Sequence, residues 1–176
     1  PETTEYMIDA KEKQKEKKGK SKKVEKTNTK LLEFWTELKD ALEKEKINYL
    51  DRVKSKPHYN IGFWKGRGKF AFCLGRNAFR VELYFNNDED KTRFDAMYQY
   101  KEELEDAVNG IQFQRLDNKK ASRIKLETTL LESNSFEGNW GDKSNWDDVI
   151  NWNVQNMITF YDGVYPIWEK AQRKLN

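Results

Sequence analysis

The chain has 176 residues, enough for one domain, and its net charge is only +3 although 36% of the residues are charged. Aromatic residues make up 14% of the sequence and include six tryptophans, so a hydrophobic core can form beneath a very polar surface. A single cysteine, Cys73, excludes a disulfide within the chain, and the lack of a secretory signal or a membrane-length apolar run predicts a cytoplasmic protein with no membrane partner.

The N-terminal segment is charged and of low complexity. Residues 11–30 hold ten lysines and three glutamates, a net charge of +7, and the first ten residues carry −3. Residues 31–176 carry −1, so any basic surface on the body depends on where its cations are placed. A stretch so rich in lysine repels itself and cannot bury a core. We predict a basic linker or a phosphate-binding arm at residues 1–29 and a single α/β domain at residues 30–176.

The domain is predicted to begin with an amphipathic helix and three strands. Leucine and tryptophan recur at helical spacing over residues 30–46, and Thr29 is a candidate N-cap. Alternating apolar residues then predict three strands, at residues 59–64, 69–74 and 78–85. Cys73 falls in the second strand, where we expect it to be a small buried side chain.

Both turns of this three-strand meander are basic. Lys65 and Arg67 lie in the first turn, Lys69 follows it, and Arg76 lies in the second turn. The first turn contains a GxG sequence, but it opens no helix, which excludes a dinucleotide-binding loop. Aromatic residues beside these cations can stack bases and hold phosphates, although a hydrophobic strand end beside a charged turn explains the same pattern.

A second helix and a β-hairpin are predicted next. The helix spans residues 88–109, with three acidic residues at its N-terminus and Gly110 after its end. Residues 111–126 alternate as two strands around an Asp117-Asn118 turn. The charged residues gathered around this turn are Arg115, Asp117, Lys119, Lys120 and Arg123.

The chain is predicted to end in a loop and a long helix. Phe136 and Trp140 are expected to pin the loop, residues 133–145, to the body. Apolar residues then keep helical spacing for six turns, and Gly163 and Pro166 are expected to kink the helix or split off its last turns. The order α-β-β-β-α-β-β-α predicts an α/β (α+β) fold, a two-layer sandwich with helices covering a largely antiparallel sheet.

Several sequence blocks resemble one family. Residues 115–124 (RLDNKKASRI), the strand at residues 80–84, the helix at residues 94–110 and Trp146 with Trp152 are similar to an uncharacterised prokaryotic family, domain of unknown function 4268. The resemblance implies an accessory domain that follows a restriction-endonuclease-like nuclease domain, and it brings no agreed activity. The chain begins with Pro, not Met, so we expect it to be a piece of a longer protein.

The element order also resembles the core of restriction-type nucleases, whose chemistry can be checked. Metal-dependent phosphodiester cleavage needs an acid on the second strand and (Asp/Glu)-x-Lys on the third. The second strand has no acid, and the third offers Glu82-Leu83-Tyr84, with tyrosine in place of lysine. We therefore predict no metal site and no cofactor. The residues left for a rearranged catalytic site are Glu82, Asp117 and Lys120.

These observations predict a non-catalytic accessory domain of a nuclease or defence-type protein that binds nucleic acid through basic hairpin turns. The predicted nucleic-acid-binding residues are Lys65, Arg67, Lys69, Arg76, Arg115, Lys119, Lys120 and Arg123. One alternative is a protein–protein or homodimerisation module that uses the tryptophan-rich loop and last helix, and another is a degenerate or rearranged nuclease. The sequence leaves two interpretations of one polar cluster, a functional site or a structural ion-pair network. The members of this cluster are Arg80, Glu82, Arg115, Asp117 and Arg123.

Overall fold

A computed structural model describes residues 2–75, 78–129 and 140–175, with side chains described from Ser21 onward. Arg76 and Phe136, both named above, lie outside the described residues. The elements in chain order are α1 (Glu2–Lys44), β1 (Asn60–Lys65), β2 (Gly68–Leu74), β3 (Ala78–Phe85), α2 (Thr92–Tyr98), α3 (Lys101–Ala107), β4 (Gln112–Gln114), β5 (Ser122–Thr129), a 3-10 turn (Lys143–Asn145) and α4 (Trp146–Leu175).

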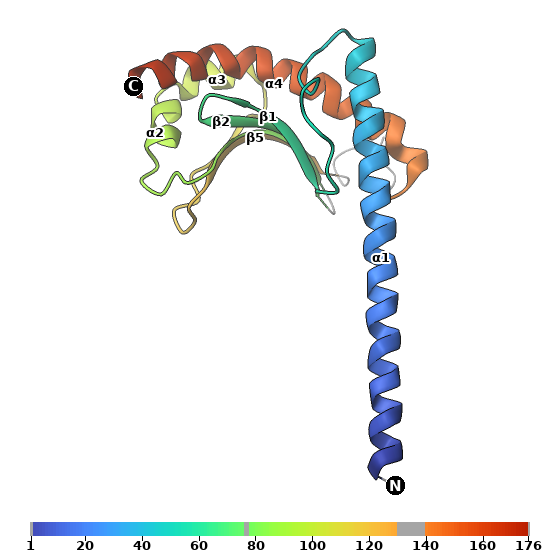
Figure 1. The fold of residues 1–176 in the computed structure, drawn as a ribbon. Helices are drawn as coiled ribbons and strands as arrows, with labels where there is room; N and C mark the ends of the chain where they lie inside the picture. The colour runs from blue at the N-terminus through green and yellow to red at the C-terminus, as the bar shows by residue number, and fades with distance from the viewer. Residues whose placement is uncertain (1, 76–77, 130–139, 176) are drawn as a thin grey trace.

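Five strands form one curved sheet in the order β1-β2-β3-β5-β4, and every neighbouring pair is antiparallel. The long helix α4 runs along one face of the sheet, with α2 and α3 beside it (Figure 1). No described helix packs on the opposite face, which we call the open face (Figure 1). This arrangement confirms the predicted α+β fold, in which helices cover an antiparallel sheet.

The core lies between the sheet and α4. Alternation along each strand sends Phe70 of β2 and Leu83 of β3 toward the helices, where Trp168 of α4 is fully buried. The apolar positions of each element therefore meet in one cluster. Seven residues that lie on the apolar faces of their elements, and that we predict from spacing to share one core, are all in this cluster, namely Trp35, Phe72, Val81, Phe94, Leu104, Val154 and Met157. Leu32, Tyr59 and Tyr98, which spacing also placed on apolar faces, are instead exposed.

The predicted start of the first helix is wrong. α1 begins at Glu2 and passes Thr29 without interruption, and the Thr29 hydroxyl donates to the Glu25 carbonyl inside the helix instead of capping it. Lysine, glutamate and glutamine are good helix formers, and no proline interrupts the segment. The N-terminal half of α1 projects away from the body (Figure 1), and Leu31 is the first buried side chain among those described.

The single helix predicted at residues 88–109 is instead two short helices, α2 and α3, separated at Gln99 and Tyr100. The first begins late because Lys91, just before it, adopts a left-handed backbone (φ 59°). The Asp88 carboxylate accepts from the backbone N–H groups of Arg93 and Phe94, which satisfies two free donors at the start of α2.

α4 does not lose its last turns at Gly163 or Pro166, and it continues as one helix to Leu175. Gly163 has a packing role. A Cβ at this position would lie 2.8 Å from Cγ2 of Val108, so glycine lets α4 approach the end of α3 closely. The loop before α4 is pinned as predicted by Trp140, whose side chain is buried against Phe34.

Candidate nucleic-acid interface

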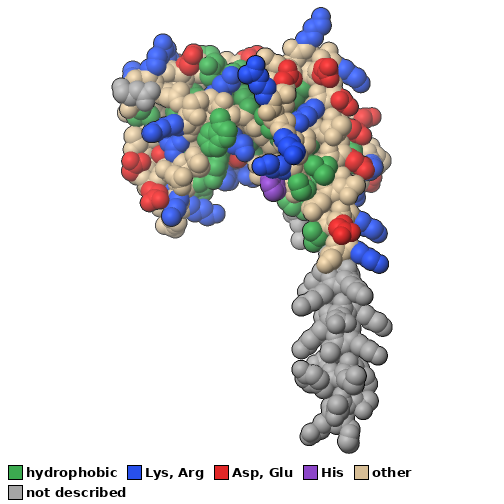
Figure 2. Space-filling view, in the orientation of Figure 1, with side chains coloured by type: hydrophobic (Ala, Val, Ile, Leu, Met, Phe, Trp, Pro, Cys, Tyr) green, Lys and Arg blue, Asp and Glu red, His purple; other side chains and the backbone are tan. Residues whose placement is uncertain are grey.

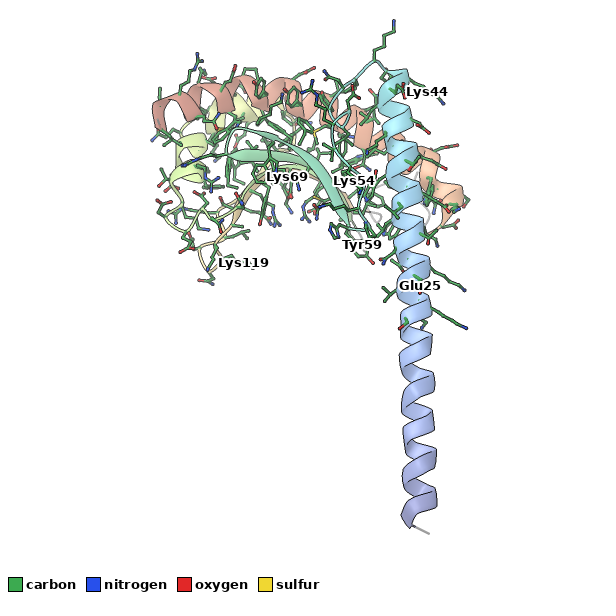
Figure 3. All side chains as sticks on the ribbon, in the orientation of Figure 1. Glu25, Lys44, Lys54, Tyr59, Lys69 and Lys119 are labelled. Carbon is green, nitrogen blue, oxygen red and sulfur yellow. The ribbon has the colours of Figure 1, made fainter. Side chains whose placement is uncertain are left out.

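The strand register aligns alternating aromatic and cationic side chains across the open face. Trp64 of β1 pairs with Lys69 of β2, Lys69 with Tyr84 of β3, and Tyr84 with Arg123 of β5. Gln114 of β4 completes the line opposite Arg123. We call these five residues the aromatic–cation row. Figure 3 shows Lys69 on the side of the sheet that faces away from α4.

The next row of paired residues on the open face has small side chains at one end and charged side chains in the middle. Gly62 pairs with Ala71, which pairs with Glu82, which pairs with Lys125. Ala71 lies in the lining of a hollow of about 300 Å³. Its polar and aromatic lining includes Tyr59, Lys69, Arg80, Glu82, Tyr84 and Arg123. In the space-filling view, the molecule is hollowed beneath the sheet, between the hairpin tip and α1 (Figure 2).

Glu82 is the centre of this hollow. Its Oε2 accepts a hydrogen bond from Nε of Arg80 at 2.9 Å and lies 3.1 Å from Nε of Arg123 in an ion pair. The Cys73 thiol donates to Oε1 at 3.3 Å. The Glu82 residue is only 5% exposed, so both guanidinium groups are held against the sheet by a buried carboxylate. Two cations around one anion leave this cluster with a net positive charge.

Cys73 belongs to this cluster but is not a nucleophile. Burial raises the pKa of its thiol well above the ordinary range, and the nearby Glu82 carboxylate raises it further. The thiolate is the reactive form of cysteine, so a thiol held protonated in this way is inert. This agrees with the predicted role of Cys73 as a small buried side chain.

The described strand residues of the open face carry a net positive charge, although the body of the protein is near neutral. Four cations on these strands exceed the two carboxylates, Glu82 and Glu127, by a net charge of +2. The cations are Lys69 and Arg80, Arg123 and Lys125, with Lys125 Nζ 2.7 Å from Oε2 of Glu127. Alternation along the strands gathers these charges on one face while the apolar residues face α4.

The tip of the β4–β5 hairpin, residues 115–121, is fixed to the loop before α2. The Asp88 N–H donates to the Lys120 carbonyl at 2.6 Å, and Lys91 Nζ donates to the carbonyls of Lys119 and Ala121 at 2.7 Å. Lys91 is only 3% exposed, so its ammonium group acts as a structural clamp. The tip projects beside the open face, with Lys119 at its end (Figure 3).

Arg115 is engaged by acidic neighbours. It donates to both oxygens of the Asp95 carboxylate, at 2.9 and 3.0 Å, and also to Asp117. These hydrogen bonds, with Asp95 first, raise the pKa of the Arg115 guanidinium, and the same contact lowers the pKa of Asp95. Two carboxylates therefore compete with a phosphate for the Arg115 guanidinium.

The five-residue polar cluster predicted from sequence divides into two separate groups. Arg80, Glu82 and Arg123 form the cluster on the open face. Arg115 and Asp117 form the other at the hairpin tip, where Asp95 joins them.

The remaining predicted cations have different settings. Lys65 places its ammonium 5.5 Å from the Tyr165 ring, on the helix-covered side. Arg67 is exposed in the β1–β2 turn, where its backbone N–H donates to Gln172 of α4. Lys119 and Lys120 are exposed at the hairpin tip. The predicted nucleic-acid-binding residues did not include Tyr84 or Lys125, although alternation along β3 and β5 places both side chains on the open face.

The residues considered for a rearranged nuclease site are not brought together. Glu82 contacts Cys73 and two arginines in mid-sheet. Asp117 pairs with Arg115 at the hairpin tip, and Lys120 lies 3.8 Å from Glu89. Within the described part of the chain, no three His, Cys, Asp or Glu side chains are placed to hold a metal ion.

We expect the chain not to cut DNA or RNA in the presence of Mg²⁺ or Mn²⁺. The open-face carboxylate is already held by two arginines, and the lysine of a restriction-type site is replaced by Tyr84. The measurement is gel analysis of labelled single strands and duplexes after long incubation with each metal. Metal-dependent cleavage that disappears in Glu82→Ala would contradict this expectation.

The fold and this face define a class of protein, a small α+β module whose sheet is covered by helices on one side and charged on the other. The family model described as "Domain of unknown function (DUF4268)" matches residues 31–167, and the chain belongs to this family. No curated protein and no solved structure matches the chain. Among the described residues, no helix is both long enough and apolar enough to cross a membrane.

Proposed function

We propose that this domain is a non-catalytic accessory module that binds nucleic acid, in the cytoplasm and beside an upstream nuclease-like domain of a nuclease or defence-type protein. The observation that carries the proposal is the aromatic–cation row on a positive, uncovered sheet face. Cations that track a phosphate backbone and aromatic rings that accept bases are the two components of many nucleic-acid interfaces.

The basic elements lie on the same side of the molecule. Lys69 on the sheet and Lys119 at the hairpin tip both lie on the open-face side, where the projecting part of α1 also extends (Figure 3). Residues 11–30, with ten lysines and three glutamates, give this N-terminal arm a net charge of +7. Phosphate contacts from these three elements supply sequence-independent affinity.

The alternative interaction module is less well supported. It relied on the tryptophan-rich loop and helix as an apolar docking surface, but Trp140 is only 8% exposed and Trp146 only 2%. Both rings contact Phe34 of α1 edge-on and so belong to the domain's own core. The tryptophans of this region therefore stabilise the fold and leave little apolar surface for a partner.

The salt dependence of binding tests the proposal. We expect the affinity of the chain for labelled oligonucleotides to fall linearly with salt on logarithmic axes, with about −0.9 in slope for each duplex phosphate contact and about −0.7 for each single-strand contact. Removing residues 1–28 should weaken binding and flatten the slope without abolishing either, because it leaves intact the core residues described from Leu31 onward. Fluorescence anisotropy at several salt concentrations measures both quantities.

A second pair of variants measures how much the folded body contributes to binding without the N-terminal arm. In the truncated chain, Arg67→Ala with Lys120→Ala should remove most of the remaining affinity. Lys44→Ala with Arg52→Ala is the matched control, since it removes the same charge near the other end of α1, where Lys44 lies away from the hairpin tip (Figure 3). Loss of all binding on truncation alone would show that the folded body does not bind nucleic acid.

A further inference from the structure

We propose that the open face binds single-stranded nucleic acid in preference to duplex, with bases stacked on Trp64 and Tyr84 and phosphates held by Lys69 and Arg123. This inference rests on the proposed function and specifies its ligand. The hairpin turns then attract the backbone, and the sheet face itself accepts the bases.

The exposed aromatic rings point to unstacked bases. Trp64 is 50% exposed on an edge strand, and Tyr59 is 51% exposed at the rim of the hollow. Tyr84 of β3 pairs with Arg123 of β5 and is partly exposed in the middle of the sheet. Bases in a duplex are stacked on each other, so their faces are available to protein rings only when the strand is single.

The spacing of the row also fits an extended single strand. Trp64 and Tyr84 lie on β1 and β3, two strand spacings apart, which is roughly 9–10 Å. Stacked nucleotides in a duplex follow one another at about 3.4 Å along each strand. Neighbouring bases must therefore splay apart to reach both rings, which a single strand can do and a duplex cannot.

Each ring has a cation over one of its faces, which leaves the other face for a base. Lys69 Nζ lies over the Trp64 ring, 6.0 Å from its centroid, and the Arg123 guanidinium lies over the Tyr84 ring, 5.9 Å from its centroid. Stacking on the rings therefore brings the sugar–phosphate backbone close to Lys69 and Arg123. Glu82 does not oppose the backbone strongly, because both of its oxygens are engaged with Cys73, Arg80 and Arg123 and it is almost fully buried.

Charge argues against a second copy of the chain as the occupant. Two open faces brought together would set a net charge of +2 against another +2. The hollow beside Tyr84 is lined by Ala71, Lys69 and Arg123 and is about 300 Å³, a volume at the small end of the range for ligand pockets. A narrow, positive hollow lined by rings fits bases and phosphates better than an apolar protein surface.

The test compares a labelled 20-nucleotide thymidine strand with a 20-base-pair duplex, using the full-length chain. We expect Trp64→Ala and Tyr84→Ala each to weaken single-strand binding by about 5- to 150-fold while leaving duplex binding and the salt slope unchanged. Trp64→Phe and Tyr84→Phe keep a ring and should retain most of the affinity. Tyr98→Ala is the matched control, because Tyr98 is 45% exposed but packs on the helix-covered side against Phe94 and Phe113.

Lys69→Ala gives an independent readout, since it should flatten the single-strand salt slope by about 0.7. Urea unfolding of every variant separates lost binding from lost structure. Single-strand affinity unchanged in Trp64→Ala and Tyr84→Ala, or lost equally for both ligands, would overturn the inference and leave the proposed function standing. No binding of either ligand by the wild-type chain at low salt would overturn both.

Discussion

Replacing Asp88 with alanine is expected to destabilise the domain by about 3–5 kcal/mol, because it removes one partner of a buried ion pair. The Asp88 residue is 1% exposed, and its Oδ1 lies 3.5 Å from Nε of Arg93. Its carboxylate also accepts from the Ser122 hydroxyl at 2.7 Å and from two backbone N–H groups of α2. All of these donors would lose a buried acceptor together. Urea unfolding with linear extrapolation measures the loss.

Two milder variants show whether the effect comes from this network. Ser122→Ala removes one donor and leaves the carboxylate in place, so it should lower the free energy of unfolding by only about 1 kcal/mol. Asp88→Asn keeps one acceptor oxygen but replaces the other with an NH2 group, which would face the existing N–H and O–H donors. Its loss in the free energy of unfolding should fall between those of the other two variants. An Asp88→Ala variant no less stable than Ser122→Ala would show that the carboxylate does not hold α2 to β5.

Asp88 also connects stability to the proposed interface. Its backbone N–H holds the hairpin tip at Lys120, and Lys91 clamps the same tip from three residues further along. The exposed lysines of the tip are therefore presented from a backbone that is already fixed, so little further backbone entropy is lost on binding. Such preorganisation increases affinity without adding a contact.

Much of the fold follows from local patterns in the sequence. Two-residue alternation predicted β3 at its observed bounds and β2 to within one residue, because one face of each strand packs against the helices. The break between α2 and α3 has no such signal, since it falls at Gln99 and Tyr100 with neither glycine nor proline. The lysine-rich composition of the N-terminal segment does not prevent it from forming the long helix α1.

The site could be predicted only in part. Alternation alone places Lys69, Glu82 and Arg123 on the polar side of their strands. Their assembly depends on register between strands that are distant in sequence, such as β3 with β5, which sets Tyr84 opposite Arg123. No local pattern specifies that register. The separation of Arg115 from Glu82 likewise follows from the position of Asp95 on α2.

Replacing Trp35 with alanine is expected to lower the free energy of unfolding by about 3–5 kcal/mol, the usual cost of deleting a buried tryptophan ring. Trp35 is fully buried on α1, its ring meets Phe34 edge-on at 5.3 Å, and its Nε1 donates to the His58 carbonyl at 2.9 Å. The variant leaves both a cavity and an unsatisfied carbonyl. Chemical denaturation followed by circular dichroism measures the change.

Matched variants on α1 show which part of this helix belongs to the domain. Trp35→Phe keeps a ring but loses the bond to His58, so it should cost about 1–2 kcal/mol. Leu32→Ala changes a side chain that is 38% exposed and should cost no more than about 0.5 kcal/mol. Burial on α1 begins at Leu31, the residue at which the family match also begins. A Trp35→Ala variant as stable as Leu32→Ala would contradict the inference that α1 is part of the core from Leu31 onward.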